Sequence, residues 1–127
     1  MKTAMLDTNV LFDLMKNEKS ALEKLKDFKG YKFVISFLVY AEVMAGSQLR
    51  VKADTRKFLR KFPVKEYDTK AHTAAVKFLN KYFTGRKNKP MDLLIAAHAK
   101  SLNIPVITNN DKDFIFKEIK VFHYSKR

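Results

Sequence analysis

The first segment of the chain reads Thr3-Ala4-Met5-Leu6-Asp7-Thr8-Asn9-Val10-Leu11-Phe12 and holds the pattern from which the fold follows. The apolar run over 4–6 is typical of a buried strand, and it ends in the carboxylate of Asp7. Thr8 and Asn9 favour turns and helix caps, and apolar periodicity resumes at Val10. The segment therefore predicts a strand, a polar turn and a helix. Ligands of open α/β sheets bind at the carboxyl ends of the strands, which is where Asp7 is expected.

The rest of the sequence continues as one domain over residues 1–127, with no linker and no internal repeat. We expect further strands over 32–36, 64–67, 105–108 and 119–122. We expect helices over 10–15, 18–28, 37–49, 54–62 and 91–101, and one from a cap at 68 or 69 to about 83. Strands that alternate with helices predict an α/β fold with a mostly parallel sheet and helices on both of its faces.

The composition narrows the class of protein. The chain has no cysteine, which excludes a disulfide framework and a thiolate metal site. Its hydrophobic content of 46% and charged content of 31% are typical of a soluble globular protein. The first residues lead into the predicted strand and not into a signal segment, and no apolar run approaches the ~20 residues that cross a bilayer. We therefore expect a cytoplasmic protein without a membrane partner.

The net charge points to a polyanionic partner. Lysine and arginine number 26 against 13 acidic residues, which gives a net charge of +13. Phosphate contacts of such a surface supply affinity for nucleic acid without sequence specificity. Six basic residues and no acidic one lie over 69–91, and six more basic residues lie over 50–61. Either cluster alone is equally consistent with a solvated helix face.

Three carboxylates stand in apolar surroundings. Asp7 ends an apolar strand, Glu42 lies within the apolar segment 37–46, and Asp92 opens the helical segment 92–99. A buried carboxylate is costly unless a positive group meets it. A shared Mg²⁺ or Mn²⁺ ion would stabilise all three, because these ions prefer oxygen ligands. An acidic metal pocket on a basic protein predicts a phosphodiesterase.

Each carboxylate also has a purely structural interpretation. Asp7 could serve only as a helix N-cap. Glu42 could pair with a lysine on a helix surface. Asp92 could be a helix-start acid that the helix dipole favours. Singly they are ordinary, and their combination favours a shared site. His98 is a lone histidine among alanines, a pattern more typical of a packed side chain than of an acid–base catalyst.

Four segments follow one another along the chain: Leu6-Asp7-Thr8-Asn9-Val10, a strand that ends at Ser36 with Glu42 in the next helix, Asp92-Leu93-Leu94-Ile95-Ala96-Ala97-His98-Ala99, and Thr108-Asn109-Asn110-Asp111-Lys112-Asp113-Phe114. In this order they resemble a PIN domain, and most closely the VapC toxins of bacterial and archaeal toxin–antitoxin pairs. The resemblance spans essentially the whole chain. It implies a three-layer α/β/α sandwich and an endoribonuclease that depends on one or two Mg²⁺ or Mn²⁺ ions.

The resemblance also implies which residues form the site. The acidic, metal-binding positions of the family fall on Asp7, Glu42 and Asp92. The fourth catalytic position, an aspartate in the stricter family pattern, falls here on Asn110, and Asp111 or Asp113 is close enough to substitute. Asparagine adds no charge, which leaves the binding of a second metal ion open. The groups that would orient the carboxylates are Thr8, Asn9, Ser36 and Thr108.

The implied reaction is hydrolysis of an RNA phosphodiester by a metal-activated water, leaving a 5′-phosphate and a 3′-hydroxyl. The resemblance suggests transfer RNA or ribosomal RNA as substrate, and the residues themselves identify neither. A basic loop just before Asp92 would contact the RNA backbone through Arg86, Lys87 and Lys89. A solvated connector is the alternative for this loop.

Two protein partners follow from the resemblance: a second copy in a homodimer, and a VapB-like antitoxin that blocks the pocket and provides the only link to promoter DNA. Phe12, Leu22, Leu25 and Phe28 could form a groove for an antitoxin helix, or could belong to the core. Two other functions stay open. One is a PIN nuclease of RNA processing or decay without an antitoxin, and the other is a non-catalytic module that binds nucleic acid.

Overall fold

The structure, a computed structural model, describes residues 2–82, 90–109, 114 and 116–125. Its strands are β1 (Lys2–Leu6), β2 (Tyr31–Ser36), β3 (Val64–Lys65), β4 (Val106–Thr108) and β5 (Val121–His123). Its helices are α1 (Thr8–Met15), α2 (Lys19–Lys26), α3 (Phe37–Gly46), α4 (Lys52–Leu59), α5 (Thr69–Tyr82) and α6 (Pro90–Leu102), with a 3₁₀ turn η1 (Leu49–Val51) before α4.

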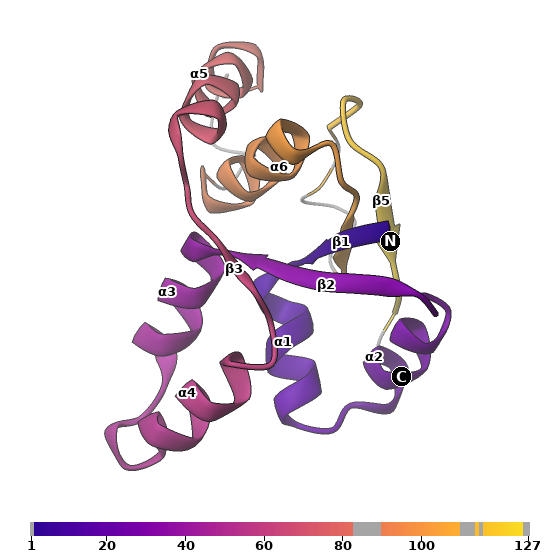
Figure 1. Cartoon of the computed structure of the whole chain (residues 1–127), viewed down its shortest axis with the longest axis vertical. Coiled ribbons are helices and arrows are strands. Elements are labelled where there is room, and N and C mark those ends of the chain that lie inside the picture. The colour runs from indigo at the N-terminus through magenta and orange to yellow at the C-terminus, as the bar shows by residue number, and fades with distance from the viewer. Residues whose placement is uncertain (1, 83–89, 110–113, 115, 126–127) are drawn as a thin grey trace.

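The five strands form one parallel sheet in the order β3-β2-β1-β4-β5. The central strand β1 pairs with β2 through Met5 and Val34, and with β4 through Leu6 and Ile107. Helices α5 and α6 cover one face, and α1 to α4 cover the other (Figure 1). The predicted α/β/α sandwich is therefore confirmed. The order of the strands changes direction between β1 and β4, which makes the carboxyl ends of these two strands the expected place for a ligand.

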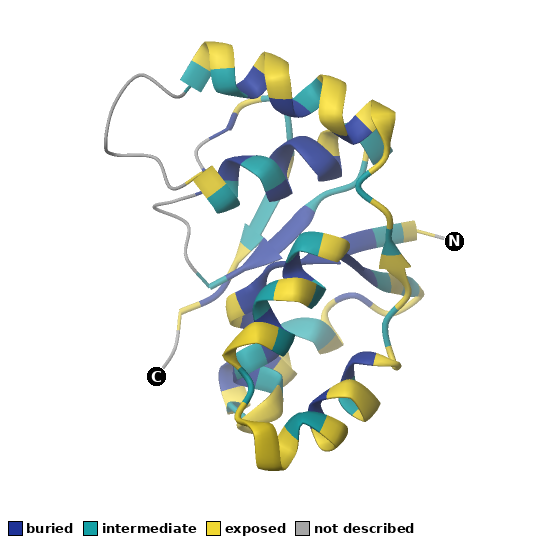
Figure 2. Cartoon of the chain, turned by 90° about the vertical axis from the view of Figure 1, so that its left-hand side faces the viewer, coloured by how far each residue is buried: buried dark blue, intermediate teal, exposed yellow. Residues whose placement is uncertain are grey.

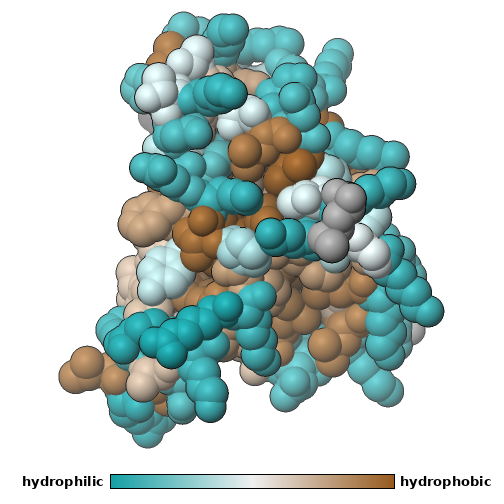
Figure 3. Space-filling view, in the orientation of Figure 1, coloured by the Kyte–Doolittle hydropathy of each residue, from teal (hydrophilic) through white to brown (hydrophobic). Residues whose placement is uncertain are grey.

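The core lies between the three layers. Met5 and Leu6 of β1 are fully buried, as are Leu93 and Ile95 of α6. Buried residues line the strands and the inner sides of the helices, whereas the outer helix faces are exposed (Figure 2). The surface of one side shows hydrophilic residues over the outer helices and apolar residues along its middle (Figure 3). Helix α6 is apolar on nearly all sides because α5 packs against it from outside.

Several helix boundaries differ from the predicted ones. The helix predicted over 10–15 begins two residues earlier, because Asp7 caps it and brings Thr8 into the first turn. The helix predicted over 37–49 ends at Gly46, because Ser47 is extended and closes the helix. The next helix, predicted over 54–62, runs from Lys52 to Leu59, since η1 leads directly into it.

The outer elements are shorter than predicted or shifted. The helix predicted over 18–28 covers Lys19–Lys26. The strand predicted over 64–67 keeps only Val64 and Lys65, which pair with β2 at the edge of the sheet. The last strand begins at Val121 and not at 119, because its pairing with β4 begins at Val106. None of the helices in the described ranges is long and apolar enough to span a bilayer.

Candidate active site at the carboxyl ends of the strands

Three buried polar residues mark the carboxyl ends of adjacent strands. Asp7 follows β1, Ser36 ends β2 and Thr108 ends β4, and their exposed fractions are 3%, 0% and 0%. Buried polar side chains require hydrogen-bond partners, and each of these three has one. The parallel sheet thus places polar side chains at one edge, which is where the sequence predicted Asp7.

Asp7 is fixed by groups from two elements. Its Oδ1 accepts a hydrogen bond from the backbone N–H of Thr8 at 2.7 Å, and its Oδ2 accepts one from Thr108 Oγ1 at 2.8 Å. The backbone N–H of Asp7 donates to the carbonyl oxygen of Ile107 at 3.0 Å. Asp7 is therefore the N-cap of α1 and also a side chain held in one orientation by β4. The cap role does not exclude a site role, because a carboxylate oxygen accepts more than one bond.

Thr8 connects Asp7 to Glu42. Its hydroxyl donates to Glu42 Oε1 at 2.6 Å, although the two residues are 34 positions apart in the sequence. Glu42 is half-buried on α3, and the ion pairs of the described residues do not include it. The alternative in which Glu42 pairs with a surface lysine is thus not what this structure shows. Thr8 instead contacts two carboxylates, that of Asp7 just after β1 and that of Glu42 on α3.

Asp92 borders the same edge from the other layer. It lies half-buried in the first turn of α6. The end of α6 leads into the amino end of β4, so α6 runs antiparallel to the strands and its first turn lies toward their carboxyl ends. Within the described residues, no three His, Cys, Asp or Glu side chains are grouped closely enough to hold a metal ion. The three predicted carboxylates thus share an edge without forming a ready-made cluster.

The remaining predicted site residues divide into described and undescribed ones. Asn9 is exposed in the first turn of α1. Ser36 caps α3 by accepting a hydrogen bond from the Leu38 N–H at 3.1 Å. The side chain that its hydroxyl contacts in the described part is His98 and not a carboxylate. The following predicted residues lie outside the described ranges: Asn110, Asp111, Asp113, Arg86, Lys87 and Lys89.

His98 is a buried histidine of α6, as the alanine-rich pattern predicted. It is 1% exposed, and its Nδ1 lies 2.8 Å from Ser36 Oγ. Ser36 Oγ already accepts from Leu38, so its hydroxyl hydrogen is available to donate to Nδ1 of a neutral imidazole. Burial lowers the pKa of His98, which keeps the ring neutral at pH 7. His98 therefore joins α6 to the end of β2.

The Tyr67 ring packs on His98 edge to face, with a centroid separation of 4.8 Å. Its hydroxyl donates to the Leu94 carbonyl oxygen at 2.9 Å. Burial raises the pKa of Tyr67 to about 12, so the phenol stays protonated and remains a donor. Tyr67 thus fixes the same helix that carries Asp92.

Asp13 is a buried carboxylate that the sequence analysis did not identify. It is 2% exposed on α1, and its Oδ2 accepts hydrogen bonds from Asn109 Nδ2 and from Tyr124 Oη, both at 2.7 Å. Burial and the contact with Asp13 raise the pKa of Tyr124, so its hydroxyl remains a donor. Thr108 and Asn109 are adjacent, so the end of β4 donates to Asp7 and to Asp13 at once. The sequence pattern that could have revealed Asp13 is a single acid among the inward-facing positions of α1, close to Val10, Leu11 and Leu14.

Two cavities of the described part lie away from this edge. One of about 550 Å³ opens at the amino ends of β1 and β2. The other, of about 610 Å³, lies between α5 and α6 over an apolar floor. Neither is lined by Asp7, Glu42 or Asp92. We place the candidate active site by its hydrogen-bonded carboxylates and by the strand order, because those features carry the chemistry.

The family assignment agrees with this geometry. The family model described as "PIN domain" matches residues 4–121, and the chain belongs to this family. The resemblance inferred from the four sequence segments is thereby confirmed.

Proteins similar to this chain include VapC proteins and VapBC assemblies. Over 117 residues the chain is 29% identical to a tRNA(fMet)-specific endonuclease VapC of Shigella flexneri, a match that covers 87% of this chain and 88% of the relative. A structure of VapBC-1 from nontypeable Haemophilus influenzae is similar with a TM-score of 0.80 and 28% identity, over 95% of this chain and 97% of that one. A DNA-bound VapBC from Salmonella typhimurium has a TM-score of 0.78 and 27% identity, with the same coverage.

Proposed function

We propose that this protein is an endoribonuclease of the VapC type and the toxin of a toxin–antitoxin pair. The observation that carries the proposal is the contact of Thr8 with both Asp7 and Glu42 at the carboxyl edge of the sheet. This pair of carboxylates lies beside the point where the strand order changes direction, in a PIN domain that is 29% identical to endonucleases specific for a transfer RNA. We therefore propose transfer RNA as the substrate.

The residues at this edge fit a hard divalent cation. Asp7 and Glu42 offer carboxylate oxygens, which Mg²⁺ and Mn²⁺ prefer, and Asp92 would supply a third carboxylate from α6. Bound there, one or two ions would lower the pKa of a water ligand and stabilise negative charge on the phosphate. Because the described residues contain no preformed group of three ligands, we expect Glu42 to turn from the Thr8 hydroxyl when the metal binds.

The protein's own residues have three tasks in this proposal. Thr108 and the Thr8 N–H hold the Asp7 carboxylate in one orientation, which reduces the entropy lost when a ligand binds. The neutral His98 and Tyr67 fix α6 and therefore the position of Asp92. The net charge of +13 draws the RNA backbone to the protein. The expected products have a 5′-phosphate and a 3′-hydroxyl.

A VapB-like antitoxin is the proposed protein partner, since the similar solved structures include VapBC complexes. The sequence left open whether Phe12, Leu22, Leu25 and Phe28 form a groove for its helix or belong to the core. Phe28 is 7% exposed and belongs to the core, whereas Leu22 is 41% exposed and Phe12 and Leu25 are half-buried. We propose that these last three side chains form the part of the α1–α2 surface that an antitoxin helix contacts. A homodimer stays a prediction from the resemblance.

The test is cleavage of total transfer RNA by the purified protein, with Mg²⁺ or Mn²⁺ and with EDTA. The wild type and Asp27→Asn, a carboxylate whose side chain is 68% exposed, should give the same discrete fragments with 5′-phosphates. Asp7→Asn and Asp92→Asn should give none, and EDTA should stop cleavage by every variant. The circular dichroism spectra of both variants should match that of the wild type, which shows that they are folded. Cleavage that survives EDTA and both substitutions would refute the proposed site, and RNA binding without any cleavage would favour the non-catalytic module.

A further inference from the structure

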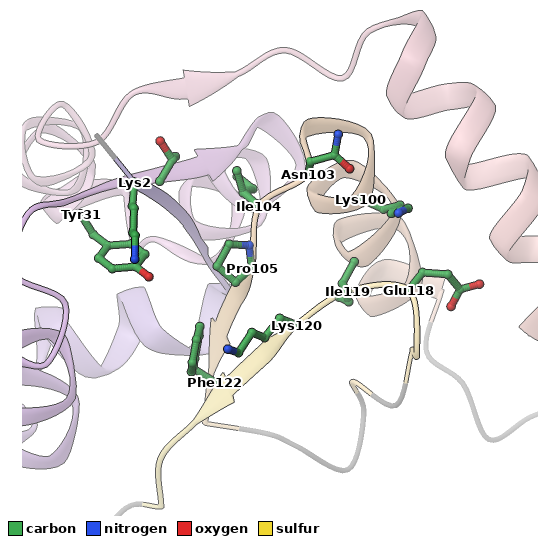
Figure 4. A pocket seen from close by; sticks show the side chains of 11 residues that line it. Lys2, Tyr31, Lys100, Asn103, Ile104, Pro105, Glu118, Ile119, Lys120 and Phe122 are labelled. Atoms are coloured by element: carbon green, nitrogen blue, oxygen red, sulfur yellow. The ribbon is translucent and has the colours of Figure 1, made fainter.

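The cavity of about 550 Å³ at the amino edge of the sheet has features of a ligand site. It has no role in the proposed nuclease reaction, which takes place at the opposite edge. Its walls are the first residues of β1 and β2, the end of α6 and the segment that leads into β5 (Figure 4). The volume is within the range of about 300–1,000 Å³ that is typical of small-molecule pockets. Lysine is the most frequent residue of its lining, at Lys2, Lys100 and Lys120.

Two of these lysines are held over aromatic rings. Lys2 Nζ lies 5.8 Å from the centroid of the Tyr31 ring, and Lys120 Nζ lies 5.0 Å from that of Phe122. Both rings are packed edge to face against Phe28, at centroid distances of 5.0 Å. The buried Phe28 thus fixes both rings. Each ring carries an ammonium group by a cation–π contact, and Figure 4 shows the two lysines beside Tyr31 and Phe122.

The charge of the lining is strongly positive. Its single acid, Glu118, accepts a hydrogen bond from Lys81 Nζ at 3.0 Å and another from Tyr82, neither of which lines the cavity. These bonds lower the pKa of Glu118 against the opposing effect of burial. Lys2, Lys100 and Lys120 form no ion pair with any residue of the described part.

The helix dipole of α6 opposes this charge only in part. The carbonyl end of α6 contributes roughly half a negative charge to the same region, and Lys100 in its last turn offsets it. Three ammonium groups around one cavity, with the acid already bound elsewhere, fit an anion of more than one charge.

We propose that this cavity binds the phosphate groups of a nucleotide. Lysine is a common phosphate ligand that acts as a point charge, and two lysines held by aromatic rings can contact oxygens of one oligophosphate. The lysines occupy the ring faces of Tyr31 and Phe122, so recognition is through phosphate and not through stacking of the base. The five residues of β1 separate Lys2 from Asp7 by roughly 16 Å, so this is a second site, independent of the carboxylates.

Isothermal titration calorimetry in EDTA tests the proposal, because chelation removes any metal-mediated binding at the carboxyl edge. The probes are ATP, GTP, AMP and a deoxythymidine tetranucleotide, the last representing phosphates of a strand. The lysines to replace are exposed, so the double variant Lys2→Gln/Lys120→Gln is expected to fold normally. Lys26→Gln/Lys57→Gln removes the same charge from exposed positions of α2 and α4 and is the matched control.

We expect ATP and GTP to bind equally well and at least ten times more tightly than AMP. The Lys2/Lys120 double variant should lose at least ten-fold in affinity, and the control less than two-fold. If only the tetranucleotide binds, with the same dependence on Lys2 and Lys120, the cavity binds the backbone phosphates of a nucleic acid strand. That result would overturn the proposal of a free nucleotide as the ligand. Absence of binding by the wild type, or an equal loss in the control pair, overturns the proposal. Neither result depends on RNA cleavage, so the outcome is independent of the proposed nuclease function.

Discussion

The two ends of the same parallel sheet differ in charge and in how that charge is held. At the carboxyl ends, Asp7 is 3% exposed and is fixed by hydrogen bonds from Thr8 and Thr108. At the amino ends, Lys2 and Lys120 are exposed, and among the described residues their ammonium groups contact the aromatic rings of Tyr31 and Phe122. The buried hydrogen bonds at the carboxyl edge contribute to the stability of the fold. A substitution there should therefore change both function and stability, whereas one at the amino edge should change binding alone.

The largest expected effect is on catalysis at the carboxyl edge. Glu42→Gln keeps an oxygen that can accept the hydrogen bond of the Thr8 hydroxyl, but it removes the negative charge. We therefore expect the rate of RNA cleavage to fall by at least about 100-fold. Single-turnover cleavage rates of transfer RNA measure it, with Glu23→Gln, an exposed acid of α2, as the control. If Glu42→Gln cleaved RNA as fast as the control, Glu42 would not be part of the catalytic site.

The next effect is on stability at the same edge. Asp13→Ala leaves the buried donors of Asn109 and Tyr124 without their acceptor, so we expect the free energy of unfolding to fall by about 2–3 kcal/mol. Urea denaturation measures this change. Asp27→Ala, which removes a carboxylate from an exposed ion pair with a 4.0 Å separation, should change stability by less than about 0.5 kcal/mol. Equal losses in both variants would mean that Asp13 holds nothing in place.

A smaller effect concerns pH. Burial lowers the pKa of His98 in the folded protein below the value of about 6.5 of an unfolded histidine. Below that value the unfolded state therefore binds more protons, and stability is lost as the pH falls from about 6.5 through the folded pKa. Unfolding curves between pH 7.5 and 5.5 should show a smaller loss for His98→Gln than for the wild type. The exposed His72→Gln should behave like the wild type, and a His98→Gln protein with an unchanged loss would contradict this interpretation.

Sequence patterns were sufficient for the order and type of the elements. The apolar strand before Asp7 and the strand that ends at Ser36 predicted the sheet edge, because strand and helix periodicities are local. The prediction over 37–49 ran past the true end of this helix at Gly46, although glycine is a local stop signal; the extended Ser47 closes the helix there, and a 3₁₀ turn follows.

The long-range contacts of the site were beyond sequence patterns. The contact of Thr8 with Glu42 spans 34 residues, and that of Asp13 with Tyr124 spans 111. Such contacts depend on how the helical layers pack on the sheet, and the periodicity of the sequence does not predict that packing. The sequence analysis did not single out Asp13, because only the packing shows that Asn109, after β4, and Tyr124, after β5, both donate hydrogen bonds to it.

Binding of Mn²⁺ followed by electron paramagnetic resonance tests most directly whether the carboxyl edge is the metal and catalytic site. We expect the wild type to bind Mn²⁺, Asp7→Asn to bind it at least ten-fold more weakly, and Asp27→Asn and Lys2→Gln/Lys120→Gln to keep the affinity of the wild type. Mn²⁺ binding by Asp7→Asn with wild-type affinity would contradict the proposed metal site, because the metal would then lie elsewhere in the protein.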